Sequence, residues 1–100
     1  MVRFQRLGRA KNGKLLEAIR FAKEVAEYIN TKYPPVSVQV YIVASGDYGT
    51  IYWYADYRDF AAFESVSAQL RSDQGYWVIV NKAMEWFIEG CFHDTLMSSV

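Results

Sequence analysis

VSVQVYIVASGDYGTIYWYADY, residues 36–57, is the stretch that decides the fold. In both of its halves, β-branched and aliphatic residues alternate with tyrosines and polar residues, which is the period-two pattern of half-buried strands. The turn sequence Gly46-Asp47-Tyr48-Gly49 lies between the halves and supplies residues that tolerate positive φ, as a tight hairpin requires. The stretch therefore predicts two antiparallel strands joined by a hairpin.

The alternation also predicts how the two strands pair. With Gly46 opposite Gly49, Tyr41 lies opposite Tyr54. The tyrosines and polar residues then share one face of the sheet, and the aliphatic residues share the other with Trp53. Because a slip of one residue would mix these two sets, the assignment of residues to faces is strongly specified.

Before the hairpin, the sequence predicts one strand and one helix. Residues 2–7 alternate as a short first strand. Residues 14–32 carry apolar residues at helical spacing, with Asn12 as the expected N-cap. Tyr33-Pro34-Pro35 ends this helix, because proline cannot continue a helix and disfavours helical backbone in the residue before it.

After the hairpin, the sequence predicts a broken helix and a last strand. Asp59 can cap a helix that continues to an interruption at residues 72–75, where Asp73 can cap another. Helical spacing then runs to Ile88, and residues 91–100 are expected to form the last strand. The order βαββαβ indicates an α+β, ferredoxin-like domain with a four-stranded antiparallel sheet and a broken second helix.

Composition narrows the class of protein. One hundred residues, of which 52% are hydrophobic, are expected to form a single domain spanning residues 1–100. No apolar run approaches the roughly 18 residues that span a bilayer, and residues 1–14 lack the apolar core of a signal peptide. We therefore expect a cytoplasmic protein with no membrane partner. The sequence has a single cysteine and no phosphate-binding glycine loop. We therefore expect neither a metal site nor a cofactor.

Charge is balanced overall but unevenly distributed along the chain. Residues 1–33 carry eight Lys or Arg against three Glu, and residues 34–100 carry three against eight acidic residues. Such asymmetry can mark a nucleic-acid surface, or it can pair the two halves of the fold or two subunits. RNA-recognition domains share the βαββαβ order, but residues 49–57 do not match their third-strand consensus, and Asp56 would repel phosphate. No nucleic-acid partner is predicted.

If the helices cover the aliphatic face, the second face of the sheet is left without them. That face is rich in tyrosine but also polar, and exposed patches of this kind mark interaction sites or ligand clefts. The simplest arrangement is a two-fold homodimer with the two sheets face to face. A cleft lined by a few polar groups would remain between the sheet and neighbouring elements.

Three segments resemble the dimeric α/β-barrel superfamily, and more narrowly its NIPSNAP-type and small antibiotic-biosynthesis-monooxygenase-like members. They are the strand-to-helix passage DYRDFAAFE at 56–64, the helix break at 73–77, and the closing stretch GCFHDTL at 90–96. The resemblance covers nearly the whole chain, as a pattern rather than a sharp motif. It implies a homodimer with a sheet-lined cavity in each subunit. The superfamily mixes cofactor-free oxygenases, haem degraders and isomerase-like enzymes, and no catalytic signature here matches one of them.

Two residues on the tyrosine-rich face are candidate catalytic groups. His93, the only histidine, can act as a general base near neutral pH or as an axial haem ligand; the alternative is a histidine that hydrogen-bonds across an interface. Asp56, opposite Gln39 and beside Tyr54, can have a raised pKa in a partly dry pocket and act as a base. Its alternative is a strand-end carboxylate that is solvated or paired with a basic residue such as Arg58.

Four further residues of this face are candidates for binding a substrate: Gln39, Tyr41, Tyr52 and Tyr54. Their side chains can stack on a small aromatic molecule or donate hydrogen bonds to it, whereas cross-strand tyrosine pairs also stabilise a sheet by themselves. Two functions therefore stay open. One is binding or conversion of a small aromatic molecule by a cofactor-free oxygenase-like or isomerase-like protein. The other is a non-enzymatic homodimeric interaction protein whose tyrosine face is only an interface.

Overall fold

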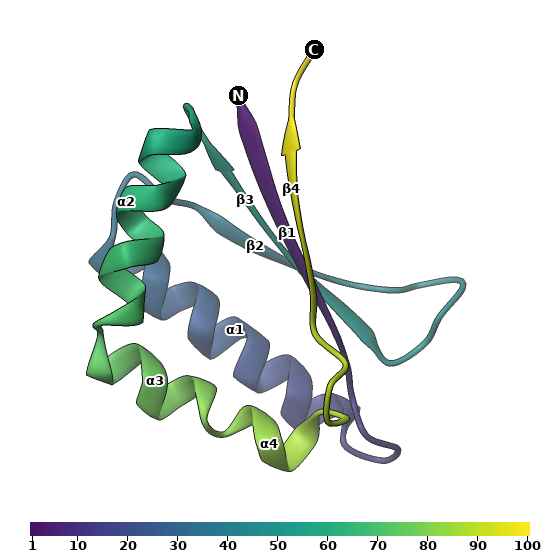
Figure 1. Ribbon diagram of the computed structural model, residues 1–100. Helices are drawn as coiled ribbons and strands as arrows, with labels where there is room; N and C mark the ends of the chain where they lie inside the picture. Colours follow the sequence, from purple (N-terminus) through teal and green to yellow (C-terminus); the bar gives the residue numbers. More distant parts are fainter.

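The computed structural model describes residues 1–100 as a four-stranded antiparallel sheet with its helices on one face (Figure 1). The elements are β1 (Val2–Arg9), α1 (Leu15–Lys32), β2 (Val38–Ile42), β3 (Thr50–Tyr57), α2 (Phe60–Arg71), α3 (Gln74–Val80), α4 (Ala83–Trp86) and β4 (His93–Ser98). The strand order is β2-β3-β1-β4, which confirms the predicted ferredoxin-like α+β fold. None of the four helices combines the length and apolarity needed to cross a membrane.

The hairpin pairs two residues away from the predicted register. Tyr41 lies opposite Tyr52, and Gln39 lies opposite Tyr54. The predicted tight turn is wrong, because β2 leaves the sheet after Ile42 while β3 stays paired with β1 as far as Thr50. A shift of two residues preserves the alternation, so the side chains of the paired strands, Val38–Ile42 and Thr50–Tyr57, keep their predicted faces.

Two of the three predicted helix caps are confirmed. The backbone N–H of Ala62 donates to Asp59 Oδ1 at 2.8 Å, and that of Tyr76 donates to Asp73 Oδ1 at 3.1 Å. Asn12 is not the N-cap of α1, which begins after Lys14 without a side-chain capping bond. The second helical region also breaks once more than predicted, between α3 and α4.

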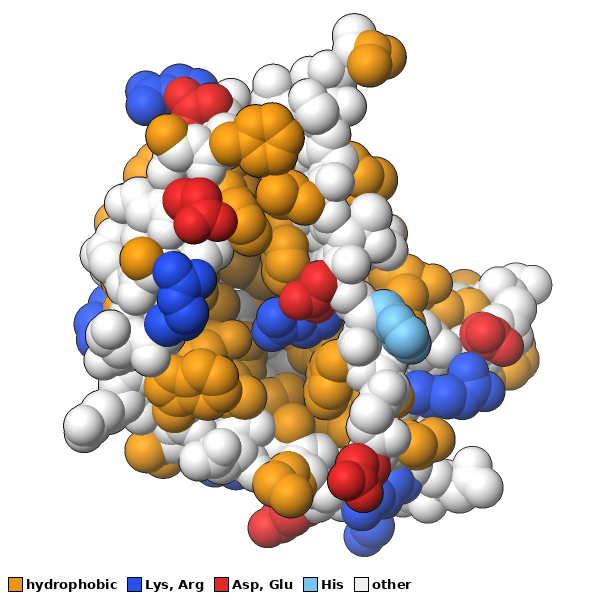
Figure 2. Space-filling model, in the orientation of Figure 1, with side chains coloured by type: hydrophobic (Ala, Val, Ile, Leu, Met, Phe, Trp, Pro, Cys, Tyr) orange, Lys and Arg blue, Asp and Glu red, His pale blue; other side chains and the backbone are white.

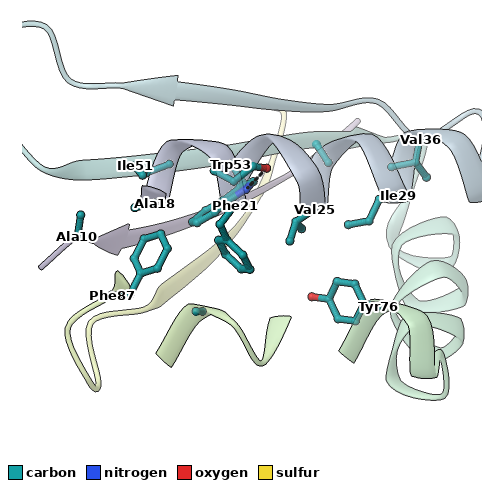
Figure 3. Close-up of a cluster of buried hydrophobic side chains, with 13 residues drawn as sticks. Ala10, Ala18, Phe21, Val25, Ile29, Val36, Ile51, Trp53, Tyr76 and Phe87 are labelled. Atoms are coloured by element: carbon teal, nitrogen blue, oxygen red, sulfur yellow. Dashed lines mark hydrogen bonds between the residues drawn. The ribbon is translucent and has the colours of Figure 1, made fainter. Parts of the chain in front are cut away.

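The hydrophobic core lies between α1 and the central strands (Figure 3). Ala18 and Ala22 are fully buried, and their small side chains let α1 approach Ile51 and Trp53 of β3 closely. The indole Nε1 of Trp53 donates to the carbonyl of Ala22 at 3.2 Å, which satisfies the one polar atom of this buried ring. By contrast, α2 has no buried residue. The helical layer is therefore packed closely at α1 and loosely at α2.

Candidate functional site

A cavity of about 570 Å³ lies between the sheet and helices α1, α2 and α3. Figure 2 shows it as a hollow with hydrophobic side chains around it and charged side chains at its centre. Sixteen of its twenty lining residues are hydrophobic, and its aromatic lining includes Phe4, Tyr57, Phe63, Tyr76, Trp77 and Phe92. A volume in this range with mostly apolar walls is typical of small-molecule sites.

Large aromatic side chains from the sheet and from α2 and α3 pack along the walls of the cavity. Near one end, the ring of Phe63 on α2 stacks on Phe4 at 5.6 Å and meets Tyr57 edge-on at 5.4 Å. On α3, the rings of Tyr76 and Trp77 pack against each other at 5.5 Å. All five of these rings line the cavity.

Arg6 and Asp94 form the polar centre of the cavity. Arg6 Nε donates to Asp94 Oδ1 at 2.7 Å, and Nη2 donates to Oδ2 at 2.8 Å. The two residues are direct neighbours on β1 and β4, on the face that the helices cover. The hydrogen bonds that Arg6 donates to Asp94 raise the pKa of Arg6 above its already high value, so the guanidinium stays charged. Bidentate pairing also fixes its orientation.

A second arginine lines the cavity from the helical side. Arg71 lies in the last turn of α2 and lines the cavity. Ser67, one turn earlier on the same helix, also lines it. The indole Nε1 of Trp77 donates to the backbone carbonyl of Arg71 at 3.1 Å, which ties this residue to the aromatic wall.

The residues predicted as a site from the sequence lie on the opposite, open face of the sheet. His93, Leu7, Tyr52 and Tyr41 form one row across its four strands. Of the six candidates, only Tyr54 has atoms that line the large cavity. Gln39 and Asp56, together with Tyr54, border a small hollow of about 120 Å³.

The tyrosines of the open face are packed against one another. Tyr52 and Tyr54 are stacked at 6.0 Å with an interplanar angle of 9°, and Tyr41 meets Tyr54 edge-on at 5.6 Å. Gln39 accepts a hydrogen bond from the Tyr41 hydroxyl at 3.1 Å, and the Arg3 guanidinium lies 5.7 Å from the Tyr54 ring centroid. These residues form a continuous aromatic surface, which we call the tyrosine face.

Asp56 is bound by an arginine that sequence reasoning had not paired with it. Arg3 lies directly opposite on β1 and donates to the carboxylate through Nε at 2.8 Å and Nη2 at 2.9 Å. This hydrogen bonding lowers the pKa of Asp56, so the expected raised pKa is wrong. The alternative partner, Arg58, lies instead beside Asp59 at 3.5 Å.

His93 and Asp56 share the open face without coming together. His93 is level with Tyr52, and Asp56 lies four residues further along β3. Given strand spacing and rise, their backbones are about 16 Å apart, too far for one acid–base pair. Their separate roles as catalytic groups stay predictions. No group of three or more His, Cys, Asp or Glu side chains is placed to hold a metal ion.

Comparisons with known proteins agree with this architecture. No protein-family model matches the sequence, and no curated protein matches it. A NIPSNAP domain protein from Burkholderia xenovorans is similar in structure, with a TM-score of 0.82 and 15% identity over 100% of this chain and 95% of that one. A NIPSNAP family protein from Agrobacterium tumefaciens has a TM-score of 0.79 and 12% identity, covering 99% and 92% of the two chains. A crystal structure of an antibiotic biosynthesis monooxygenase has a TM-score of 0.72 and 16% identity over 100% and 99%. The chain thus has the ferredoxin-like fold of these proteins, which confirms the likeness expected from the sequence.

Proposed function

We propose that this protein binds a small aromatic molecule in the cavity between the sheet and the helices. The observation that carries the proposal is a half-open space of about 570 Å³ with aromatic walls and a fixed ion pair, Arg6–Asp94, at its centre. Apolar walls favour an apolar ligand, and a few oriented polar groups provide specificity. One protein of the same fold is described as an antibiotic biosynthesis monooxygenase, and that description also suggests an organic ligand.

Filling the cavity should weaken this binding. We expect the neutral fluorescent probe N-phenyl-1-naphthylamine to bind the parent protein, and Ser67→Trp to weaken its binding at least about tenfold, equivalent to about 1.4 kcal/mol. The indole would occupy the space that the probe needs, because Ser67 lines the cavity from α2. A fluorescence titration measures both dissociation constants.

Ser65→Trp is the matched control, because Ser65 lies on the same helix but is exposed and outside the cavity lining. It should bind the probe as the parent does. Failure of the parent to bind the probe, or equal binding by Ser67→Trp, would show that the cavity is not a binding site.

We also propose that the protein is a homodimer joined through its tyrosine face. This face has no helix over it, and Tyr41 is 53% exposed. Its charges are balanced in pairs, Arg3 with Asp56 and Arg9 with Asp47, so two copies can approach without net repulsion. The cavity lies on the other side of the sheet, so dimerisation leaves it accessible. We infer a cytoplasmic location for this dimer, where the single thiol of Cys91 stays reduced.

Light scattering should give a mass twice the 11.6 kDa of one chain. The double variant Tyr41→Glu, Tyr52→Glu should be monomeric, because it buries two unpaired carboxylates at the proposed interface. Tyr48→Glu changes an exposed loop tyrosine and should stay dimeric. The monomeric variant should still bind N-phenyl-1-naphthylamine. A monomeric parent would refute the dimer and leave the proposal for the cavity unaffected.

A further inference from the structure

We infer that the ligand of the cavity is an anion: an amphipathic carboxylate whose aromatic body lies against the apolar walls and whose charged group binds Arg71. This inference rests on the proposed function of the cavity and names the chemical class of its ligand. It follows from the charges that line the cavity and from the partners that each of them has.

Three charged side chains line the cavity, and two of them neutralise each other. Arg6 and Asp94 are joined by two hydrogen bonds. Arg71 is the third, and it leaves the cavity with one positive charge in excess. A charge beside a low-dielectric wall attracts an opposite charge more strongly than it would in open water. The cavity is therefore electrostatically suited to an anionic ligand.

Arg71 is distinguished from the other basic residues by its lack of a partner. Seven basic side chains form ion pairs with carboxylates, and Arg71 is not among them. Its guanidinium also makes no hydrogen bond to the protein. The other basic side chains without an ion pair are Lys11, Arg20 and Lys23, and none of these lines the cavity. Arg71 alone combines a free guanidinium with a place at the binding site.

The surroundings of Arg71 fit both parts of an aromatic carboxylate. Trp77 donates its indole N–H to the Arg71 backbone carbonyl, and both residues line the cavity, so an aromatic wall and a cation belong to the same part of the site. A planar guanidinium binds a carboxylate through two parallel hydrogen bonds. The last turn of a helix also favours a cation, which suits an arginine without an acidic partner at this position.

Two probes of the same shape and different charge test the inference. Anthracene-9-carboxylate should bind the parent about tenfold more tightly than the neutral anthracene-9-carboxamide, measured by fluorescence titration at low ionic strength. The preference should decrease as salt is added. Arg71→Gln should remove it by weakening the acid and leaving the amide unchanged. Arg71→Lys should keep part of it.

Arg20→Gln is the matched control, because it removes the same charge from an exposed residue outside the cavity. It should leave the ratio of the two dissociation constants as in the parent. Equal binding of acid and amide, or an unchanged ratio in Arg71→Gln, would overturn the inference. If the amide then bound the parent but not Ser67→Trp, the proposed function would still be supported. If N-phenyl-1-naphthylamine binds and the carboxylate does not, the inference alone is wrong. If no probe binds, both fail.

Discussion

Replacing Trp53 with alanine should lower the free energy of unfolding by about 3–5 kcal/mol. Trp53 is 6% exposed and lies at the centre of the aromatic core (Figure 3). Its ring packs against Phe21, Phe87 and Phe92 at centroid distances of 6.4, 6.0 and 6.2 Å. Alanine would remove these contacts, enlarge the neighbouring cavity, and leave the Ala22 carbonyl without its indole donor. The midpoint of thermal unfolding should fall by roughly 15–30 °C.

Two control variants separate the contribution of the packed Trp53 ring from that of its hydrogen bond and from the effect of removing any tryptophan. Trp53→Phe keeps an aromatic ring and loses the hydrogen bond, so we expect a cost of about 1–2 kcal/mol. Trp77→Ala removes a ring that is 43% exposed at the edge of the cavity, and it should cost about 1 kcal/mol or less. Urea denaturation measures all three variants. An equal loss in Trp77→Ala and Trp53→Ala would contradict the core described above.

Asp73→Ala should also strongly destabilise the protein, with a fall in the unfolding midpoint on the order of 10 °C. The carboxylate is almost completely buried and accepts hydrogen bonds from the hydroxyls of Tyr28 at 2.8 Å and Tyr33 at 2.6 Å. It also accepts from the backbone N–H of Tyr76 at 3.1 Å and lies 3.0 Å from Lys32 Nζ. This one side chain joins the end of α1 to the start of α3. Its loss leaves several donors without a partner.

The contribution of Asp73 should depend on pH in a definite direction. The hydrogen bond from Tyr33, with those from Lys32 and Tyr28, holds the pKa of Asp73 well below its usual range in the folded protein. Its stabilisation is therefore complete above the unfolded-state pKa, near 3.9, and is lost as the pH falls towards the folded-state pKa.

Urea denaturation between pH 7 and pH 3 measures this dependence. The stability difference between the parent and Asp73→Asn should be constant above about pH 5 and shrink below about pH 4. Asp47→Asn changes a carboxylate whose side chain is 80% exposed and should have little effect at any pH. A difference for Asp73 that stays constant down to pH 3 would show that the buried cluster does not control its protonation.

The parts of the fold that depend on local sequence were predictable. Period-two alternation assigned the residues of β2 and β3 to the correct faces, and Asp59 and Asp73 were recognised as caps from the residues beside them. The register was wrong because it depends on a distant partner: β1 holds the beginning of β3 in the sheet after β2 has left it. Loop residues 43–49 contain no signal of that pairing.

A sheet-lined cavity was expected, but with the residues of the tyrosine face as its site. Its position beneath the helices was not predicted, because that position depends on how far α2 stands from the sheet. One signal was available: Arg6 and Asp94 occupy positions on the core-facing side of the first and last strands, where alternation calls for apolar residues. A charged side chain on a core-facing position is costly unless it is paired with an opposite charge. The opposite charges of Arg6 and Asp94 could therefore have predicted that β1 and β4 are neighbours and that a polar centre lies beneath the helices. Arg71 has no such signal, since arginine in a last helical turn is common.

The absence of buried residues in α2 has a consequence for how fast a molecule can reach the cavity. Local opening requires less free energy where fewer apolar side chains become exposed, and α1, α3 and α4 each have at least one buried residue while α2 has none. Detachment of α2 is thus the least costly way to widen the mouth. Association with a bulky ligand would then be limited by the frequency of this opening, rather than by diffusion, and residence time would be set by the same motion.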